Sequence, residues 1–159
     1  RYLGGASFGG DKAIFAYGRD GASNGLSMSN LVSNSGVIAS DVTGVGTARM
    51  SLAAVGYGGD KAVFAYGENT SSNALVNTRN LVSNIGVVAA DATGAGTARN
   101  ALGAAPYGGD KGAFGFGYIA EEASNLKTLV SNTGVVSADV SGVGTARYYT
   151  SGAGYSFSA

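Results

Sequence analysis

A block of about fifty residues occurs three times in this chain, and this repetition limits the folds open to it more than any other feature. Three motifs mark the copies: Gly-Gly-Asp at 9–11, 58–60 and 108–110, Leu-Val-Ser-Asn at 31–34, 81–84 and 129–132, and Gly-Thr-Ala-Arg at 46–49, 96–99 and 144–147. Such a period is typical of proteins whose repeats bury a shared core against their neighbours. The sequence therefore predicts repeat units 1–48, 49–98 and 99–146, followed by 147–159 as the first strand of a partial fourth unit.

Each unit contains four short segments with the character of β-strands. In the second unit they are 49–57, 61–67, 80–84 and 86–92, separated by turns rich in Gly and Asn. Val, Tyr and Phe favour strands, and no segment keeps the 3.6-residue apolar period of a helix. Several segments are apolar on both faces, which predicts sheets covered on both sides. We expect an all-β repeat protein with β-propeller-like blades of about four strands and a period of about 50 residues; a β-solenoid is the alternative.

The amino-acid sequence of the repeat resembles that of a known family. An Arg, a strand of small residues at 51–57 and the glycine-ended strand at 58–67 ("GGDKAVFAYG") are similar to the Kelch repeat. Kelch units usually carry a Gly-Gly pair after the second strand and a Trp before the fourth, whereas this chain has a single Gly there and no Trp. The resemblance covers the whole chain and implies a β-propeller. Near-identical glycine-rich repeats also resemble those of bacteriophage virion proteins, which implies a structural role in a virion.

The composition excludes several classes of function. Ten basic and ten acidic residues give a net charge of zero, so the chain lacks the basic excess that binds nucleic acid. It has no Cys and no His, which disfavours a disulfide framework, a transition-metal site and a histidine-based triad. No apolar run reaches the roughly 20 residues of a membrane helix. We therefore expect no enzyme activity, cofactor or membrane insertion.

Thirteen of the twenty charged residues recur with the repeat, in near balance of sign. They are Arg1, Arg49, Arg99 and Arg147; Asp11, Asp60 and Asp110; Lys12, Lys61 and Lys111; and Asp41, Asp91 and Asp139. A catalytic group is needed once, whereas an ion pair or a turn cap is needed in every unit. We therefore interpret these residues as a structural pairing network, with the Asp-Lys pairs setting the turn of the first hairpin.

Other interpretations of the recurring motifs have less support. The loops "DVTGVGT", "DATGAGT" and "DVSGVGT" each bring one carboxylate, where a calcium loop uses several. The alternative is an Asp that caps a glycine turn by accepting backbone N–H bonds. "GAGTAR" lacks the strand–loop–helix context of a phosphate-binding loop. A glycoside hydrolase needs two facing carboxyl groups, and the neighbours Glu121 and Glu122 would point in opposite directions on a strand.

Three segments differ between the units, at 19–30, 68–80 and 118–128, and contain the seven remaining charges. Loops on a rigid scaffold commonly bind partners, although these also could vary because nothing constrains them. Their Asn, Ser, Gly and Thr residues suit sugar hydroxyls or another polar surface, whereas the aromatic platform usual in sugar sites is limited to one Tyr. The candidate binding residues are Arg19, Asp20, Asn24, Glu68, Asn69, Asn73, Arg79, Tyr118, Glu121, Glu122 and Lys127.

Three blades and one strand do not close a propeller, which has typically four to eight blades. Because Arg1 reads as the end of a preceding Gly-Thr-Ala-Arg, we expect the chain to be the C-terminal part of a longer repeat polypeptide. Further repeats, or other copies in a homo-oligomer, would cover the open sheets, and 147–159 would serve as a closure strand. The sequence thus predicts a non-enzymatic structural or interaction module of a virion or extracellular fibre, whose partners include a glycan or another virion protein; the alternative is a glycan-binding propeller.

Overall fold

The computed structural model describes residues 1–155, and this part of the chain is built from β-strands and turns without a helix. The prediction of an all-β protein is confirmed. No helix that could cross a bilayer occurs among these residues. The strands are β1 Gly4–Phe8, β2 Lys12–Ala16, β3 Ser29–Val32, β4 Arg49–Met50, β5 Ala53–Tyr57, β6 Lys61–Ala65, β7 Glu68–Asn69, β8 Arg79–Val82, β9 Gly103–Tyr107, β10 Lys111–Gly115, β11 Tyr118–Ile119, β12 Glu122–Ala123 and β13 Lys127–Val130.

Three antiparallel sheets have the same strand order and register. They are β1-β2-β3, β5-β6-β8 and β9-β10-β13. Residues Ile14, Val63 and Ala113 hold one position of the middle strands, opposite Ala6, Val55 and Ala105 of the first strands. The next residues along the middle strands, Phe15, Phe64 and Phe114, point to the opposite face because side chains alternate along a strand.

The fourth strand predicted for each unit is reduced to isolated bridges. The segments after β3, β8 and β13 return along the sheet edge and pair at single positions, such as Val32 with Ile38 and Val82 with Val88. A glycine with positive φ precedes each of these segments, for example Gly86 at 86°. The turn brings the chain back to the edge, but its ladder is too interrupted for a regular strand.

Each first hairpin turns on the Gly-Gly-Asp-Lys motif, as predicted. Both glycines adopt positive φ, at 63° and 79° for Gly58 and Gly59, a conformation that side chains disfavour. The Lys61 Nζ lies 2.6 Å from the Asp60 Oδ1, and the pairs Lys12–Asp11 and Lys111–Asp110 are formed at 3.0 and 3.2 Å. Successive turns are also joined, because the N–H of Gly58 donates to the carbonyl oxygen of Asp110 at 2.7 Å.

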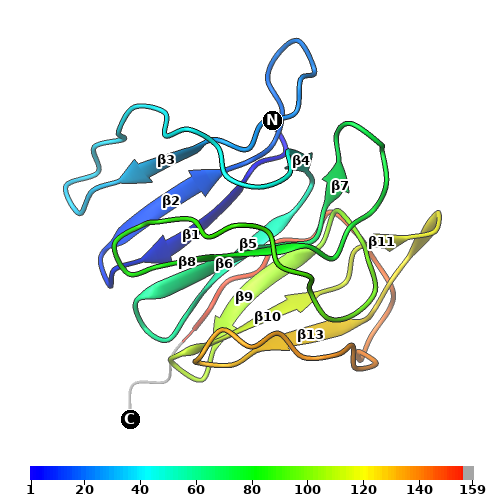
Figure 1. Cartoon of the computed structure of the whole chain (residues 1–159). Coiled ribbons are helices and arrows are strands. Elements are labelled where there is room, and N and C mark those ends of the chain that lie inside the picture. The colour runs from blue at the N-terminus through cyan, green and yellow to red at the C-terminus, as the bar shows by residue number, and fades with distance from the viewer. Residues whose placement is uncertain (156–159) are drawn as a thin grey trace.

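The three sheets pack face to face in a fan, with β1, β5 and β9 adjacent along its inner side (Figure 1). One core lies between the first and second sheets and contains Phe8, Ile14, Tyr17, Leu52 and Phe64 among its buried residues. A second core lies between the second and third sheets and contains Val55, Val63, Tyr66, Phe114 and Val130. The middle sheet is therefore covered on both sides, as its doubly apolar strands predicted.

A ladder of backbone hydrogen bonds joins the inner ends of the units. The N–H of Ser51 donates to Tyr2 at 3.0 Å, that of Ala101 to Ser51 at 2.8 Å, and that of Tyr149 to Ala101 at 2.7 Å. Tyr149 thus takes the position of Ala101 one sheet further on. Residues 150–155 continue along β9 as the first strand of a fourth sheet would, although they form no regular strand (Figure 1). The rest of the predicted closure strand, 156–159, lies outside the described residues.

This ladder corrects the expectation for Arg1. Tyr2 aligns with Ser51, so Arg1 lies at the position of Met50 and not of Arg49. Its amino group donates to the carbonyl oxygen of Arg19 at 2.7 Å, in the place where Met50 pairs with Glu68. Arg1 is exposed and takes no part in the buried network described below.

Candidate functional site

Arg99 is fully buried at the interface between the second and third sheets. Its Nη1 lies 3.0 Å from the Asp139 Oδ1, its Nη2 donates to the Thr128 Oγ1 at 2.7 Å, and its guanidinium stacks over the Tyr66 ring at 4.2 Å. Asp139 also accepts a hydrogen bond from the backbone N–H of Thr97 at 2.6 Å. Asp139 thus forms an ion pair and also caps the glycine turn.

Arg49 has the same place at the interface between the first and second sheets. It stacks over the Tyr17 ring at 4.1 Å, donates to the Asn80 Oδ1 at 2.6 Å and lies 3.7 Å from the Asp91 Oδ1. Asp91 accepts hydrogen bonds from the N–H and hydroxyl of Thr47 at 2.9 and 2.6 Å. Burial acts to raise the pKa of Asp91, but the hydrogen bonds from Thr47 and Asn80 outweigh it, so the net pKa is lowered. Asp139 behaves in the same way.

Asp41 and Arg147, the equivalents of Asp91 and Arg99 at the two ends of the molecule, form no Arg–Asp ion pair within residues 1–155. The Asp41 carboxylate accepts a hydrogen bond from Asn30 at 2.8 Å, but Arg1 lies one position out of register and is not its partner. Arg147 stacks over the Phe116 ring at 4.0 Å, as Arg49 and Arg99 stack on theirs, yet it is exposed and has no ion pair within residues 1–155. No group of three acidic residues that could hold a metal ion occurs in that same part of the chain.

The three variable segments lie on one side of the fan, where Figure 1 shows the loops that follow β2, β6 and β10. Several predicted binding residues brace their own loops. The Asp20 carboxylate accepts from the Asn24 backbone and side chain at 2.8 and 2.9 Å, and these bonds lower the pKa of Asp20. The Asn69 Oδ1 accepts from the Ser71 N–H at 2.8 Å. These polar groups shape the loops before any partner binds.

The remaining candidates are spread over several environments. Arg19 packs its guanidinium 3.4 Å from the Met50 sulfur, and Glu68 accepts a hydrogen bond from the Asn100 amide at 3.0 Å. Asn73, Glu121 and Glu122 lie in or beside tight turns, while Arg79 and Lys127 begin strands β8 and β13. The structure does not gather these residues into one site.

Tyr118 lies in an aromatic cluster that the sequence did not reveal. Its ring centroid is 5.1 Å from that of Tyr148, which is 5.2 Å from that of Tyr149. With Asn100 and Ala101 these rings line a hollow of about 310 Å³. The signal available in the sequence was the Tyr-Tyr pair after Arg147, at the place where the third unit has Asn-Ala and the second has Met-Ser.

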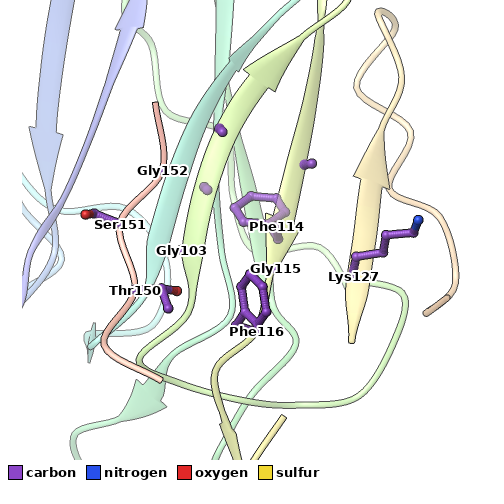
Figure 2. A pocket seen from close by; sticks show the side chains of 11 residues that line it. Gly103, Phe114, Gly115, Phe116, Lys127, Thr150, Ser151 and Gly152 are labelled. Atoms are coloured by element: carbon purple, nitrogen blue, oxygen red, sulfur yellow. The ribbon is translucent and has the colours of Figure 1, made fainter. Parts of the chain in front are cut away.

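A second hollow, of about 200 Å³, lies on the outer face of the third sheet. Figure 2 shows Phe114, Gly115 and Phe116 on one side of it and the segment from Thr150 to Gly152 on the other. Ala113 also lines this hollow. Its equivalents in the other sheets, Ile14 and Val63, are buried by the next sheet along the chain. The outer face of the third sheet thus has the same design as a buried interface but has no sheet over it within residues 1–155.

No protein-family model matches the sequence, and no curated protein shows significant similarity to it. The candidate functions therefore rest on the residues and geometry described above.

Proposed function

We propose that this protein is a non-enzymatic structural module, built of propeller-like blades, that assembles by stacking its end sheets on those of further copies. The resemblance of its repeats to Kelch units and to glycine-rich phage virion repeats is the ground for placing it in a virion or an extracellular fibre. The even distribution of its buried polar groups over the repeat supports a scaffold rather than an enzyme.

One observation carries this proposal: each end of the fan presents one half of the interface that the molecule forms twice inside. Inside, Tyr17 and Phe64 meet edge to face at 5.5 Å, and Tyr66 and Phe114 do so at 5.4 Å. At the first sheet the equivalent phenylalanine, Phe15, is 40% exposed. At the third sheet Phe116 stands in the place of Tyr17 and Tyr66, without a phenylalanine of a following sheet among residues 1–155 to meet it.

The end faces of the first and third sheets are complementary in shape as well as in the residues that they present. The Phe64 ring lies 3.2 Å from the point where a Cβ on Gly4 would be, so the first sheet receives this ring on a bare glycine. Gly103 holds the same position in the third sheet and lines the outer hollow. Phe15 of a second copy therefore has a matching seat there. Such a head-to-tail contact forms a ring if it closes and a fibre if it does not.

Residues 150–155 lie along β9, where the first strand of the incoming sheet would run. Residues 150–154 are small, mostly exposed and form no regular strand, and we expect the second copy to displace them. Their position explains why the hollow is partly covered and yet not filled (Figure 2).

Light scattering behind size exclusion, over a range of concentrations, tests the assembly. We expect masses above 15.6 kDa that rise with concentration. Phe15→Asp and Ala113→Arg, on opposite end faces, should each give monomers. A mixture of the two variants should form dimers and nothing larger, because only one intact pair of faces remains.

The matched control is Val87→Asp, which places the same charge on an exposed edge residue of the middle sheet and should assemble as the unchanged protein does. A folded monomer at every concentration would overturn the proposal. So would a mixture of the end-face variants that stays monomeric.

A further inference from the structure

We propose that the hollow between Tyr118, Tyr148 and Tyr149 binds a pyranose ring of a glycan. This proposal concerns other contacts than those between the sheets, but Tyr148 and Tyr149 hold the positions that Arg1 and Tyr2 of an incoming copy would take. Sugar binding is therefore measured on the monomeric variant Phe15→Asp as well as on the unchanged chain. The hollow of about 310 Å³ falls within the range of volumes typical of small-molecule sites.

The three rings offer the apolar surface that a sugar needs. A pyranose presents a face of C–H groups, which packs on an aromatic ring, and a rim of hydroxyl groups. Tyr148 and Tyr149 are 47% and 72% exposed, so their faces are not used up in a core. Neighbouring rings are tilted by 57° and 55°, and the cluster therefore forms walls rather than a flat stack.

Polar groups at the hollow can hold the hydroxyl rim. The Asn100 amide donates one hydrogen bond to the Glu68 Oε2 at 3.0 Å, which fixes the orientation of the carboxamide that lines the hollow. A carboxamide supplies both a donor and an acceptor, and each tyrosine hydroxyl can do either. Fixed groups of this kind lose little freedom when a ligand binds.

The lining favours a neutral ligand. Its five residues are Asn, Ala and three Tyr, and none of them is charged. A site for a nucleobase adds a basic groove for the phosphates. An aromatic cage binds a quaternary ammonium group through the positive charge of that group. The nearby charge at Glu68 is negative, which opposes phosphate, and its carboxylate is already bonded to Asn100.

The cluster is specific to this end of the molecule. The positions of Tyr148 and Tyr149 hold Asn100 and Ala101 in the preceding unit, and the equivalents of Tyr118 are Arg19 and Glu68. A ring needed only to hold the fold would be expected in every unit, as the repeated phenylalanines Phe15, Phe64 and Phe114 are. The tyrosines therefore point to a local role.

Saturation-transfer NMR tests the site with the intact chain and a panel of methyl pyranosides, namely the glucoside, galactoside, mannoside and N-acetylglucosaminide. Saturating the tyrosine rings should label the C–H protons of at least one sugar. Tyr148→Ala should weaken its binding by about tenfold or more, since it removes the central ring. Tyr118→Phe keeps the ring and should retain most of the binding.

The matched control is Tyr107→Ala, which removes a half-exposed tyrosine at the opposite end of β9 and should leave sugar binding unchanged. Phe15→Asp, the assembly variant, should also bind sugar normally, so failure of one proposal is distinguishable from failure of the other. The proposal is overturned if no sugar of the panel is labelled, if Tyr148→Ala and Tyr107→Ala behave alike, or if choline binds to the cluster and the sugars do not.

Discussion

The interior interfaces and the two end faces of this molecule use the same positions of the repeat but differ in what covers them. Phe64 is fully buried against Tyr17, whereas Phe15, in the same register one sheet earlier, is 40% exposed. Arg99 is buried between two sheets, whereas Arg147 stacks on its ring in the open. Local sequence is nearly the same in each pair. The repeated side chains are therefore buried only where a second sheet packs on their own sheet.

The comparison is tested most strongly by the phenylalanine pair. Phe64→Ala should lower the free energy of unfolding by about 3–5 kcal/mol, because it opens a cavity in a closed interface. Phe15→Ala should cost about 1 kcal/mol or less, since that ring is largely outside any core. Urea titrations of both variants under monomeric conditions give the two values. Equal losses would show that the end face is covered in solution even in the monomer.

The arginine pair should give the next largest difference. Arg99→Met removes the partner of Asp139 and the cation over Tyr66, which leaves a partly buried carboxylate unpaired and should cost about 3 kcal/mol. Arg147→Met loses only a stacking contact at the surface and should cost about 0.5–1 kcal/mol. Thermal unfolding of the two variants checks the order. If Arg147→Met is the more damaging change, the end face contributes stability that its exposure does not indicate.

Small residues also distinguish the interfaces. A Cβ added to Gly112 would lie 2.6 Å from the Val55 Cγ1. The equivalent positions at the interface of the first two sheets hold Ala62 and Ala6, which both belong to or pack against its core. Gly112→Ala should therefore cost about 1–3 kcal/mol by overpacking. Adding Val55→Ala to that variant should recover much of the loss, because it rebuilds the alanine pair. Denaturant unfolding of both single variants and the double variant measures this coupling.

Gly115→Ala provides the control on the end face. Nothing lies within 4 Å of its added Cβ, and the equivalent residue in the second sheet is already Ala65. We expect no loss of stability. A loss similar to that of Gly112→Ala would mean that the glycines are needed for their backbone and not for the space they leave.

Much of the fold was predictable because its signals are local. Paired glycines predicted the turns, and short apolar runs predicted the strands. The recurring, balanced charges predicted a pairing network, to which the buried Arg49 and Arg99 belong. The weak fourth strands were not predictable, because their segments have the same apolar residues as regular strands. In the structure these segments pair with the sheet edge at isolated positions, such as Val82 with Val88.

The remaining features could not be predicted because they depend on strand register and on contacts between residues distant in the sequence. Arg1 lies eight residues before its Gly-Gly-Asp turn, while Arg49 and Arg99 lie nine before theirs, and that single residue removes Arg1 from the network. The tyrosine cluster brings Tyr118 against Tyr148, thirty residues away, which lies in the first segment of the next unit. Their spacing in the sequence does not indicate that they are in contact, so this aromatic cluster was not predicted.

The smallest expected effect is the pH dependence contributed by the two carboxylates at the interior interfaces. Asp91 and Asp139 have pKa values below that of an unfolded aspartate, because their hydrogen bonds outweigh the effect of burial. A lowered folded pKa contributes stability that is present above the unfolded pKa, about 3.9, and is lost as the pH falls through the folded pKa. Urea unfolding should therefore show stability falling below about pH 4. Asp139→Asn should reduce the slope. An unchanged slope in Asp139→Asn would show that the interior carboxylates are not the groups that titrate.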